Sequence, residues 1–428
     1  MIIVLFIALI LLLFLGVPII FCLGISSMIY IIFSPLPLSI IPQKMVIALE
    51  SYILIALPLF ILAGEIMNKG GITLRLINFS KVFVGGFKGG LAYVNILVSM
   101  LFGGVQGMAS ADTAVIGSTL IPAMVEDGYE LDFSAAVTVA SSTVGPIIPP
   151  SFLFIVYGMV AQVSIGALFL GGIFPGIMLG FSLMALVFLM GKDKKNKNKF
   201  PQGKRIPFKI AIKYILEGLP ALILPLIIIG GIVFGIFTAT EAAGIAVVYS
   251  LLVTLLFMEL KIRDLPKILF DTAKVSGSIC LILSTATLFA WILTAERIPY
   301  ILGNYLVAFS DNKILLLLLL NVFLLFIGTF MDPMPSVLIL TPILLPALKD
   351  IGMHPVHIGI FICFNLIIGL TTPPVGQCLF IASNIGKLSI ERISKAIIPF
   401  WIIIVVVLLF ITYFPLVVTF LPKLIMGV

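Results

Sequence analysis

Long apolar runs separated by short polar connections extend along most of the chain. An α-helix needs about 20 apolar residues to cross the hydrocarbon core of a bilayer. Runs of that length predict nine crossings, at residues 2–32, 46–67, 133–160, 167–190, 216–236, 240–260, 272–295, 355–385 and 396–421. The pattern therefore predicts an all-α polytopic membrane protein.

Two further apolar stretches, 91–122 and 314–346, contain Gly, Pro and small polar residues near their middle. This pattern is typical of a helical hairpin that enters and leaves the membrane on one side, so we predict two re-entrant hairpins. The spans 133–160 and 355–385 carry similar clusters, which break backbone hydrogen bonds that lipid cannot replace. We expect two broken transmembrane helices whose unwound segments line a cavity. Proline kinks and close glycine packing between helices are the alternative.

The composition excludes a soluble protein. Of the 428 residues, 61% are hydrophobic and 10% are charged, and the mean hydropathy is +1.31, whereas a soluble domain carries about 25% charged residues. The net charge of +7 comes from basic residues in short connections between apolar runs, where they set orientation. We therefore expect no nucleic-acid partner. The four cysteines have no metal-ligand spacing, and we interpret them as small apolar residues.

The basic segment 192–213 carries nine Lys and Arg residues and one acid. Cytoplasmic loops of membrane proteins are enriched in Lys and Arg, so we place this segment in the cytoplasm. The N-terminal run 2–32 exceeds the 7 to 15 apolar residues of a signal peptide, and we interpret it as one retained membrane helix. On this count of crossings, the N-terminus is cytoplasmic and the C-terminus is periplasmic.

A shift of 224 residues superposes helix-breaking residues of the two halves without a gap. It pairs Gly104 with Gly328, Pro122 with Pro346, Gly128 with Gly352, Gly145 with Gly369, and Pro149-Pro150 with Pro373-Pro374. On the count of crossings, 46–67 and 272–295 run in opposite directions. This indicates an inverted repeat, which is common in secondary transporters.

The repeat predicts three parts of the chain. Residues 1–190 form the first repeat, with scaffold helices, an amphipathic arm at Thr73–Lys88, the first hairpin and a broken helix. Residues 191–215 form a basic cytoplasmic linker. Residues 216–428 hold a linking helix, unmatched in the first half, and the second repeat with its scaffold helices, hairpin, broken helix and last span.

Asp112 and Asp332 are the only acidic residues in the two hairpins and the spans that follow them. Carboxylates inside a membrane are costly and mark functional sites by default. Each lies just beyond the middle of its hairpin, so the alternative is that it caps the second helix. No Lys or Arg occurs in the hairpins or the broken spans. An anionic substrate would therefore meet backbone amides, hydroxyls and bound cations.

Enzyme motifs are absent from the sequence. It contains no GxxxxGK[ST] for nucleotide phosphates, no GxSxG and no HExxH. We therefore expect that the protein is not an enzyme and that an ion gradient, and not ATP bound to this chain, supplies the energy.

Five stretches resemble the most characteristic sequences of one transporter family, and the resemblance covers nearly the whole chain. They are ALPLFILAGEIM (56–67), FGGVQGMASADTAVIG (102–117), GPIIPPS (145–151), GIFTATEAAGIAVVY (235–249) and LTTPPVG (370–376). The chain looks like the large membrane subunit of tripartite ATP-independent periplasmic (TRAP) transporters. TATE stands where TPTE is common in that family, and no four-helix segment is fused to the chain.

The resemblance implies a sodium-coupled elevator in the bacterial inner membrane. The transport domain, built from the hairpins and broken helices, would slide against a scaffold. Expected partners are a small four-helix membrane subunit, a periplasmic substrate-binding protein and a small organic acid, such as a C4-dicarboxylate or sialic acid. A stand-alone sodium/dicarboxylate symporter and, from another class, a passive channel subunit are the alternatives.

The expected site residues surround the two hairpin tips and the two helix breaks. About two co-transported Na⁺ ions would bind among Gly104, Ser110, Asp112, Ser141, Gly145, Gly328, Asp332, Thr371, Thr372 and Gly376. The substrate would contact Gly107, Ser110, Ser142, Thr143, Pro335, Ser336 and Thr372.

Overall fold

The computed structural model describes residues 2–192, 200–203, 206–257, 260–298, 301 and 312–427. Every regular element within these ranges is a helix. Seven described helical segments are long and apolar enough to cross a membrane: Tyr52–Lys69, Ile165–Lys192, Phe208–Val233, Ala239–Leu256, Ile262–Ala295, Lys313–Phe330 and Ile390–Tyr413. The predicted all-α membrane architecture is therefore confirmed.

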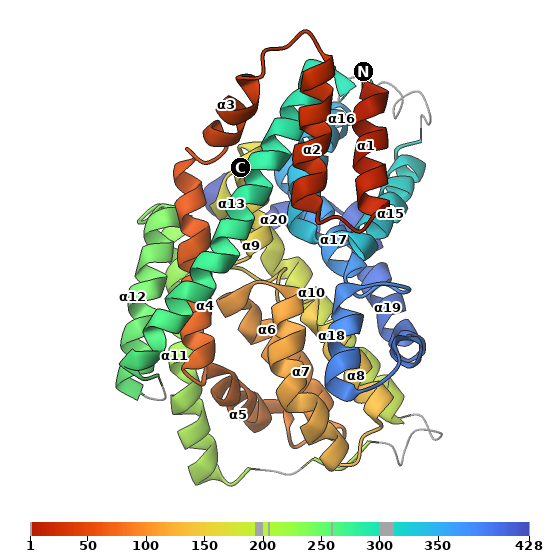
Figure 1. Ribbon diagram of the computed structural model, residues 1–428. Coiled ribbons are helices and arrows are strands. Elements are labelled where there is room, and N and C mark those ends of the chain that lie inside the picture. The colour runs from red at the N-terminus through yellow and green to blue at the C-terminus, as the bar shows by residue number, and fades with distance from the viewer. Residues whose placement is uncertain are drawn as a thin grey trace.

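The N-terminal apolar run is not one helix. It forms α1 (Ile2–Phe14) and α2 (Ile19–Phe33), which lie side by side (Figure 1). In the turn between them, Gly16 has a φ of +75° and Pro18 precedes α2. The prediction of one crossing over 2–32 is wrong, because a left-handed glycine and a proline reverse the chain there.

This turn also changes the path of the chain at its N-terminal end. Because the chain folds back, α1 begins at the end of the molecule where α2 finishes, and Figure 1 places that end opposite α5 (Ile72–Val84). The sides of the membrane on which the two termini lie stay a prediction. Gly235, with a φ of +70°, joins α11 (Phe208–Val233) to α12 (Ala239–Phe257) through a similar turn. The chain therefore turns in a similar way after α1 and after α11.

Helices on the left of Figure 1 pack on one another. There α4 (Ala56–Lys69) lies against α12 and α13 (Leu265–Ala295), and α11 lies against α5 and α12. The predicted amphipathic arm is the helix α5. The crossing expected from residue 46 begins later, because α3 (Ile40–Ile47) and the short helix η1 (Tyr52–Ile55) precede α4. The short helix η3 (Ile262–Asp264) precedes α13.

Each predicted hairpin is a pair of helices. The first pair is α6 (Gly90–Gln106) and α7 (Ala109–Glu126), and the second is α15 (Lys313–Phe330) and α16 (Pro333–Asp350). Figure 1 shows the first pair in the lower half of the molecule and the second pair in the upper half. Their re-entrant placement in a bilayer stays a prediction.

Each predicted broken span consists of two short helices with an unwound stretch between them. They are α8 (Leu131–Ser142) with α9 (Phe152–Ala161), and α17 (Pro355–Gly369) with α18 (Gln377–Gly386). The peptide bonds Pro149-Pro150 and Pro373-Pro374, one in each stretch, are both cis. The breaks therefore lie where the sequence predicts them.

In both halves, a hairpin glycine touches a glycine of the broken helix. A Cβ on Gly103 would lie 2.3 Å from the carbonyl oxygen of Gly145, and a Cβ on Gly369 would lie 2.4 Å from the carbonyl carbon of Gly328. Only a residue without a side chain permits this approach. A contact between two glycines therefore joins each hairpin to its broken helix, with the hairpin glycines one residue apart in the repeat.

Two long helices follow the broken helices. They are α10 (Ile165–Lys192) and α19 (Ile390–Tyr413), and the final helix α20 (Leu416–Met426) packs against α10. The last span, predicted to reach residue 421, thus ends at Tyr413. Part of the basic linker lies outside the described residues, and α11 begins within its expected range. The remaining domain boundaries stay a prediction.

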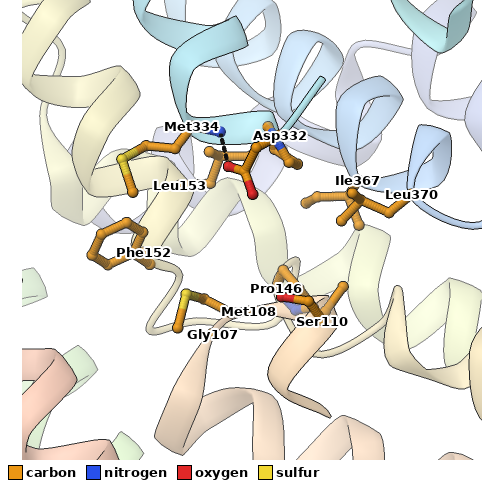
Figure 2. Close-up of a pocket in the computed structure, with 12 residues that line it drawn as sticks. Gly107, Met108, Ser110, Pro146, Phe152, Leu153, Asp332, Met334, Ile367 and Leu370 are labelled. Carbon is orange, nitrogen blue, oxygen red and sulfur yellow. Dashed lines mark hydrogen bonds between the residues drawn. The ribbon is translucent and has the colours of Figure 1, made fainter. Parts of the chain in front are cut away.

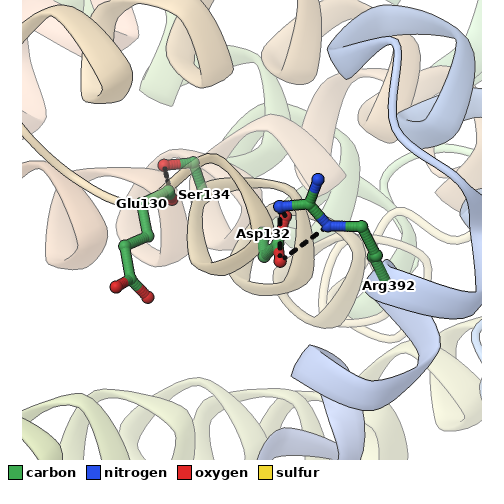
Figure 3. A network of polar contacts seen from close by, with 4 residues as sticks. All are labelled: Glu130, Asp132, Ser134 and Arg392. Atoms are coloured by element: carbon green, nitrogen blue, oxygen red, sulfur yellow. Dashed lines mark hydrogen bonds and ion pairs between the residues drawn. The ribbon is translucent and has the colours of Figure 1, made fainter.

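Arg392 joins α19 to the first turn of α8 (Figure 3). Its Nε and one terminal nitrogen each donate to Asp132 Oδ2 at 3.1 Å, and the Ser134 hydroxyl donates to the Glu130 carbonyl oxygen at 2.9 Å. The carboxylate also lies at the positive end of the α8 dipole. This ion pair therefore links the first broken helix to the last long helix.

Candidate functional site

The tips of the two hairpins meet at one pocket (Figure 2). Gly107, with a φ of +62°, ends α6, and Met108 precedes α7 in extended conformation. At the other tip, Asp332 precedes α16, also in extended conformation. Residues from both helix breaks complete the pocket, whose empty volume is about 410 Å³. Its lining residues are Gly107, Met108, Ala109, Ser110, Pro146, Phe152, Leu153, Asp332, Pro333, Met334, Ile367 and Leu370.

The start of α7 offers hydrogen-bond donors to this pocket. The first amides of a helix have no partner within the helix, and no side chain caps α7. Ala109 and Ser110, from this first turn, line the pocket. A helix N-terminus with open amides is suited to binding an anion. None of the described residues that line the pocket is Lys, Arg or His.

Asp332 caps the opposite helix and also faces the pocket. Its Oδ1 accepts a hydrogen bond from the amide of Met334 at 3.0 Å. The other carboxylate oxygen points into the pocket in Figure 2. The capping alternative is therefore confirmed for Asp332, and one oxygen remains available for a ligand.

Asp112 has a different environment. Its side chain is 2% exposed and the Ser99 hydroxyl lies beside it, but that hydroxyl donates to Ser141, and neither carboxylate oxygen accepts a hydrogen bond of ordinary geometry from the described residues. It lies in the first turn of α7 but does not cap that helix. A buried carboxylate without a partner is strongly destabilising. The capping alternative does not hold for Asp112, and in its ionised form the carboxylate would be stabilised by a cation beside it.

Oxygen atoms converge beside Asp112. A Cβ built on Gly145 would lie 3.4 Å from Asp112 Oδ2 and 3.4 Å from the carbonyl oxygen of Ser99. The glycine therefore leaves a small space between a carboxylate and a carbonyl. Hard cations prefer oxygen ligands of these two kinds. Among the expected sodium ligands, Asp112 and Gly145 are thus neighbours.

A buried polar network extends from this space along α6 and α8. The hydroxyl of Ser99 donates to Ser141 Oγ at 3.1 Å, and the hydroxyl of Ser141 donates to Asn95 Oδ1 at 3.0 Å. Asn95 Nδ2 donates in turn to Thr138 Oγ1 at 2.6 Å. The sequence analysis included Ser141 but missed Asn95 and Ser99. Their polarity within the otherwise apolar first arm of the hairpin was the available signal.

The second half has a corresponding network of asparagines, which the sequence analysis also missed. Asn365, which lies 224 residues after Ser141, donates from Nδ2 to Asn321 Oδ1 at 2.9 Å. The hydroxyl of Thr412 donates to the same oxygen at 3.3 Å. Asn365 Oδ1 is buried without a hydrogen-bond partner among the described residues. Each half therefore has a polar connection between its hairpin and its broken helix.

Residues expected at the second break form a compact turn. The hydroxyls of Thr371 and Thr372 both donate to the carbonyl oxygen of Ile368, at 2.9 and 3.0 Å. Trp401 Nε1 donates to Thr372 Oγ1 at 3.0 Å. Gly376, with a φ of +42°, lies beside the carbonyl oxygens of Leu370 and Thr372. This turn thus brings carbonyl oxygens together around Gly376.

Other expected residues lie away from the pocket between the tips. Gly104 packs against Pro225 of α11, and Gly328 packs against Gly369. Ser142, Thr143 and Ser336 are buried, and their hydroxyls donate to carbonyl oxygens of their own chain segment at 2.7 to 2.8 Å. Pro335 is buried within α16. Of the expected substrate contacts, only Gly107 and Ser110 line the pocket, and the roles of the others stay predictions.

The Cys378 thiol lies within electrostatic reach of both carboxylates, Asp112 and Asp332. It is buried in α18, and the hydroxyls of Thr113 and Ser142 lie beside it. The two acidic residues therefore lie in one region around Cys378, although they belong to different hairpins.

Comparisons with known proteins agree on one family. The family described as "Tripartite ATP-independent periplasmic transporter, DctM component" matches residues 6–417. The sialic acid TRAP transporter large permease protein SiaM of Vibrio cholerae is 36% identical, over 97% of each chain. The C4-dicarboxylate TRAP transporter large permease protein DctM of Pseudomonas aeruginosa is 37% identical, over 94% of this chain and 93% of its own.

A solved structure supports the fold. The Alcanivorax borkumensis YdaH transporter superposes with a TM-score of 0.57, over 84% of each chain, at 16% sequence identity. At this identity the likeness concerns the fold alone. It indicates that the helical arrangement described above occurs in an experimentally determined transporter.

Proposed function

Since this chain belongs to the family of TRAP transporter large membrane subunits, we propose that it moves a small organic acid across the bacterial inner membrane together with sodium ions. The observation that carries this proposal is the buried carboxylate of Asp112, which has no hydrogen-bond partner among the described residues. A sodium ion would supply the missing partner.

The cation site lies between the first hairpin and the first broken helix. A charged residue at the centre of a membrane costs about 2.5 to 3.5 kcal/mol. A sodium ion held by Asp112, the Ser99 carbonyl and the unwound backbone near Gly145 offsets that cost. A second ion binds at the free oxygen of Asp332. The carbonyl oxygens around Gly376, in the second break, are its other expected ligands.

The substrate occupies the pocket between the tips. A carboxylate of the organic acid accepts hydrogen bonds from the open amides at the start of α7 and from the Ser110 hydroxyl. A cation bound at Asp332 offsets the repulsion between the Asp332 carboxylate and the carboxylate of the substrate. Phe152, Leu153 and Ile367 contribute the apolar lining that excludes water. The substrate class is that of the named relatives, sialic acid or a C4-dicarboxylate.

The mechanism is an elevator with two partners. The hairpins and broken helices surround the pocket and form the unit that moves. The helices α4, α11, α12 and α13 pack on one another beside it and form the scaffold. A small four-helix membrane subunit completes the scaffold, and a periplasmic binding protein delivers the substrate.

Uptake into proteoliposomes tests the proposal. Vesicles containing this chain, its small subunit and its binding protein receive labelled succinate or sialic acid. Accumulation requires an inward sodium gradient and no ATP, and it stops when choline replaces sodium. Equal accumulation in choline would contradict sodium coupling.

A further inference from the structure

The base of the first hairpin is closed by a residue from the connection after α10. Phe200 is 6% exposed, and its ring lies 5.0 Å from the ring of Phe133 and 6.2 Å from that of Tyr129, between ring centroids. Gly89, which precedes α6, and Gly191, near the end of α10, also face this ring. A phenylalanine thus fills the space between the hairpin, the broken helix and α10.

The repeat offset maps these neighbours onto an open cavity in the second half. Adding 224 to Gly89, Tyr129, Phe133 and Gly191 gives Lys313, Met353, His357 and Pro415. All four line a single cavity at the base of the second hairpin, with about 880 Å³ of empty space. The position that Phe200 fills in the first half is therefore open in the second half, and Lys313 and His357 replace Gly89 and Phe133 in its walls.

The cavity is cationic. Lys313 at the start of α15 and Lys423 on α20 line it together with His354. Lys313 Nζ donates to the carbonyl oxygen of Ile351 at 2.9 Å, which holds the ammonium group at the wall. His354 Nδ1 accepts from the amide of Val356 at 3.3 Å, so its proton is on Nε2. The described lining residues include no acid.

The surroundings of the cavity indicate that its ligand is a lipid. The start of α15 lines the cavity, and Figure 1 shows α15 in the half of the molecule opposite α5, the side on which Lys and Arg are depleted if α5 is cytoplasmic. An anionic partner would stabilise two lysines that line one cavity on that side. Beside it, Ile314, Leu416 and Leu424 are 63%, 70% and 68% exposed, so apolar chains would contact the adjacent surface. Tyr413 lies at the rim, as is common at a membrane interface.

We propose that the cavity at the base of the second hairpin binds the phosphate of an anionic phospholipid headgroup, between Lys313, Lys423 and His354. The acyl chains lie along the exposed apolar residues of α15 and α20. The lipid then occupies the place that Phe200 occupies in the first half, and it joins the second hairpin to the second broken helix and the C-terminal helix.

Lipid binding to the purified full chain tests the proposal. In detergent, the unfolding temperature is measured with added phosphatidylglycerol, with phosphatidylcholine or with inorganic phosphate at the same concentration. Phosphatidylglycerol should raise the unfolding temperature of the wild type, and the other two should not. Each lysine near a lipid phosphate contributes about fivefold in affinity, so Lys423→Gln should weaken phosphatidylglycerol binding about fivefold and Lys313→Gln/Lys423→Gln more.

Lys349→Gln is the matched control, because Lys349 is an exposed lysine near the end of α16 that does not line the cavity. It should bind phosphatidylglycerol like the wild type. Stabilisation by inorganic phosphate alone would identify a free-anion site and overturn the lipid proposal. Undiminished phosphatidylglycerol binding by Lys423→Gln and by the double variant would overturn it as well. Neither outcome bears on sodium-coupled uptake, because the test requires no transport.

Discussion

The two hairpin units of this protein share a backbone plan but use the carboxylates near their tips, Asp112 and Asp332, differently. Asp332 gives one oxygen to the amide of Met334 and turns the other toward the pocket. Asp112 is buried beside Gly145 without a hydrogen-bond partner among the described residues. The fold therefore repeats the place of a helix break, whereas the chemistry at each break depends on individual side chains.

The polar residues behind the carboxylates differ in the same way. In the first half, hydroxyls of Ser99 and Ser141 connect the carboxylate region to Asn95. In the second half, amide side chains of Asn321 and Asn365 take that position. The first network therefore consists mainly of hydroxyls, and the second mainly of side-chain amides.

Substitutions at the glycine contacts test the backbone plan that the two hairpin units share. Gly103→Ala and Gly369→Ala each place a Cβ within about 2.4 Å of backbone atoms in the partner segment. Both should lower the free energy of unfolding by about 3 kcal/mol and abolish uptake. The measurement is thermal unfolding of the purified variants, together with transport.

Gly277→Ala on α13 is the control, because a Cβ there meets no atom within 4 Å. Its stability should equal or exceed that of the wild type. A wild-type unfolding temperature for either Gly103→Ala or Gly369→Ala would show that the close approach is not required in that half.

The role of Asp332 is tested by a substitution that keeps its cap. Asparagine caps helices as well as aspartate does, so Asp332→Asn should fold normally. Loss of the charge should lower the apparent sodium affinity of uptake about tenfold. Asp332→Ala, which also removes the cap, should in addition lose about 1 kcal/mol of stability. An unchanged sodium dependence in Asp332→Asn would leave capping as its only role.

The smallest effect is expected at the ion pair between Asp132 and Arg392. Their side chains are 30% and 61% exposed, and exposed pairs contribute about 0.2 to 1 kcal/mol. A double-mutant cycle with Asp132→Asn and Arg392→Gln should give a coupling energy below about 1 kcal/mol. A much larger value would make this contact a structural requirement of the first half.

The sequence predicted most of the architecture because helix-breaking residues are visible in an apolar chain. The breaks near Gly107, Gly145, Asp332 and Gly376 all lie where Gly and Pro indicated. The turn at Gly16 was missed although Gly16 and Pro18 are helix-breaking residues, because no polar residue stands near them and a length criterion treats the run as one span. The positions of Gly and Pro indicated the hairpin tips and the helix breaks, whereas the N-terminal fold depends on the turn at Gly16 and Pro18.

Site chemistry was less accessible to sequence. The two carboxylates stood out because acids are rare in this chain. Only the structure distinguishes the cap at Asp332 from the unpartnered carboxylate of Asp112, because that difference depends on a few ångströms of side-chain placement. The polar networks at Asn95 and Asn321 required contacts between helices that are distant in sequence. The hydroxyls of serines such as Ser336 donate to carbonyl oxygens of their own chain segment. Residue type alone therefore predicted more substrate contacts than the pocket has.

Sodium binding to the purified chain tests the central role of Asp112 most directly. The unfolding temperature is measured as sodium replaces choline at constant ionic strength, without partners or substrate. A ligand at 100 times its dissociation constant stabilises the folded state by about 2.7 kcal/mol. The wild type and Asp132→Asn should therefore gain stability with sodium, and Asp112→Asn should lose most of that gain while remaining folded. A full sodium-dependent shift in Asp112→Asn would contradict the account.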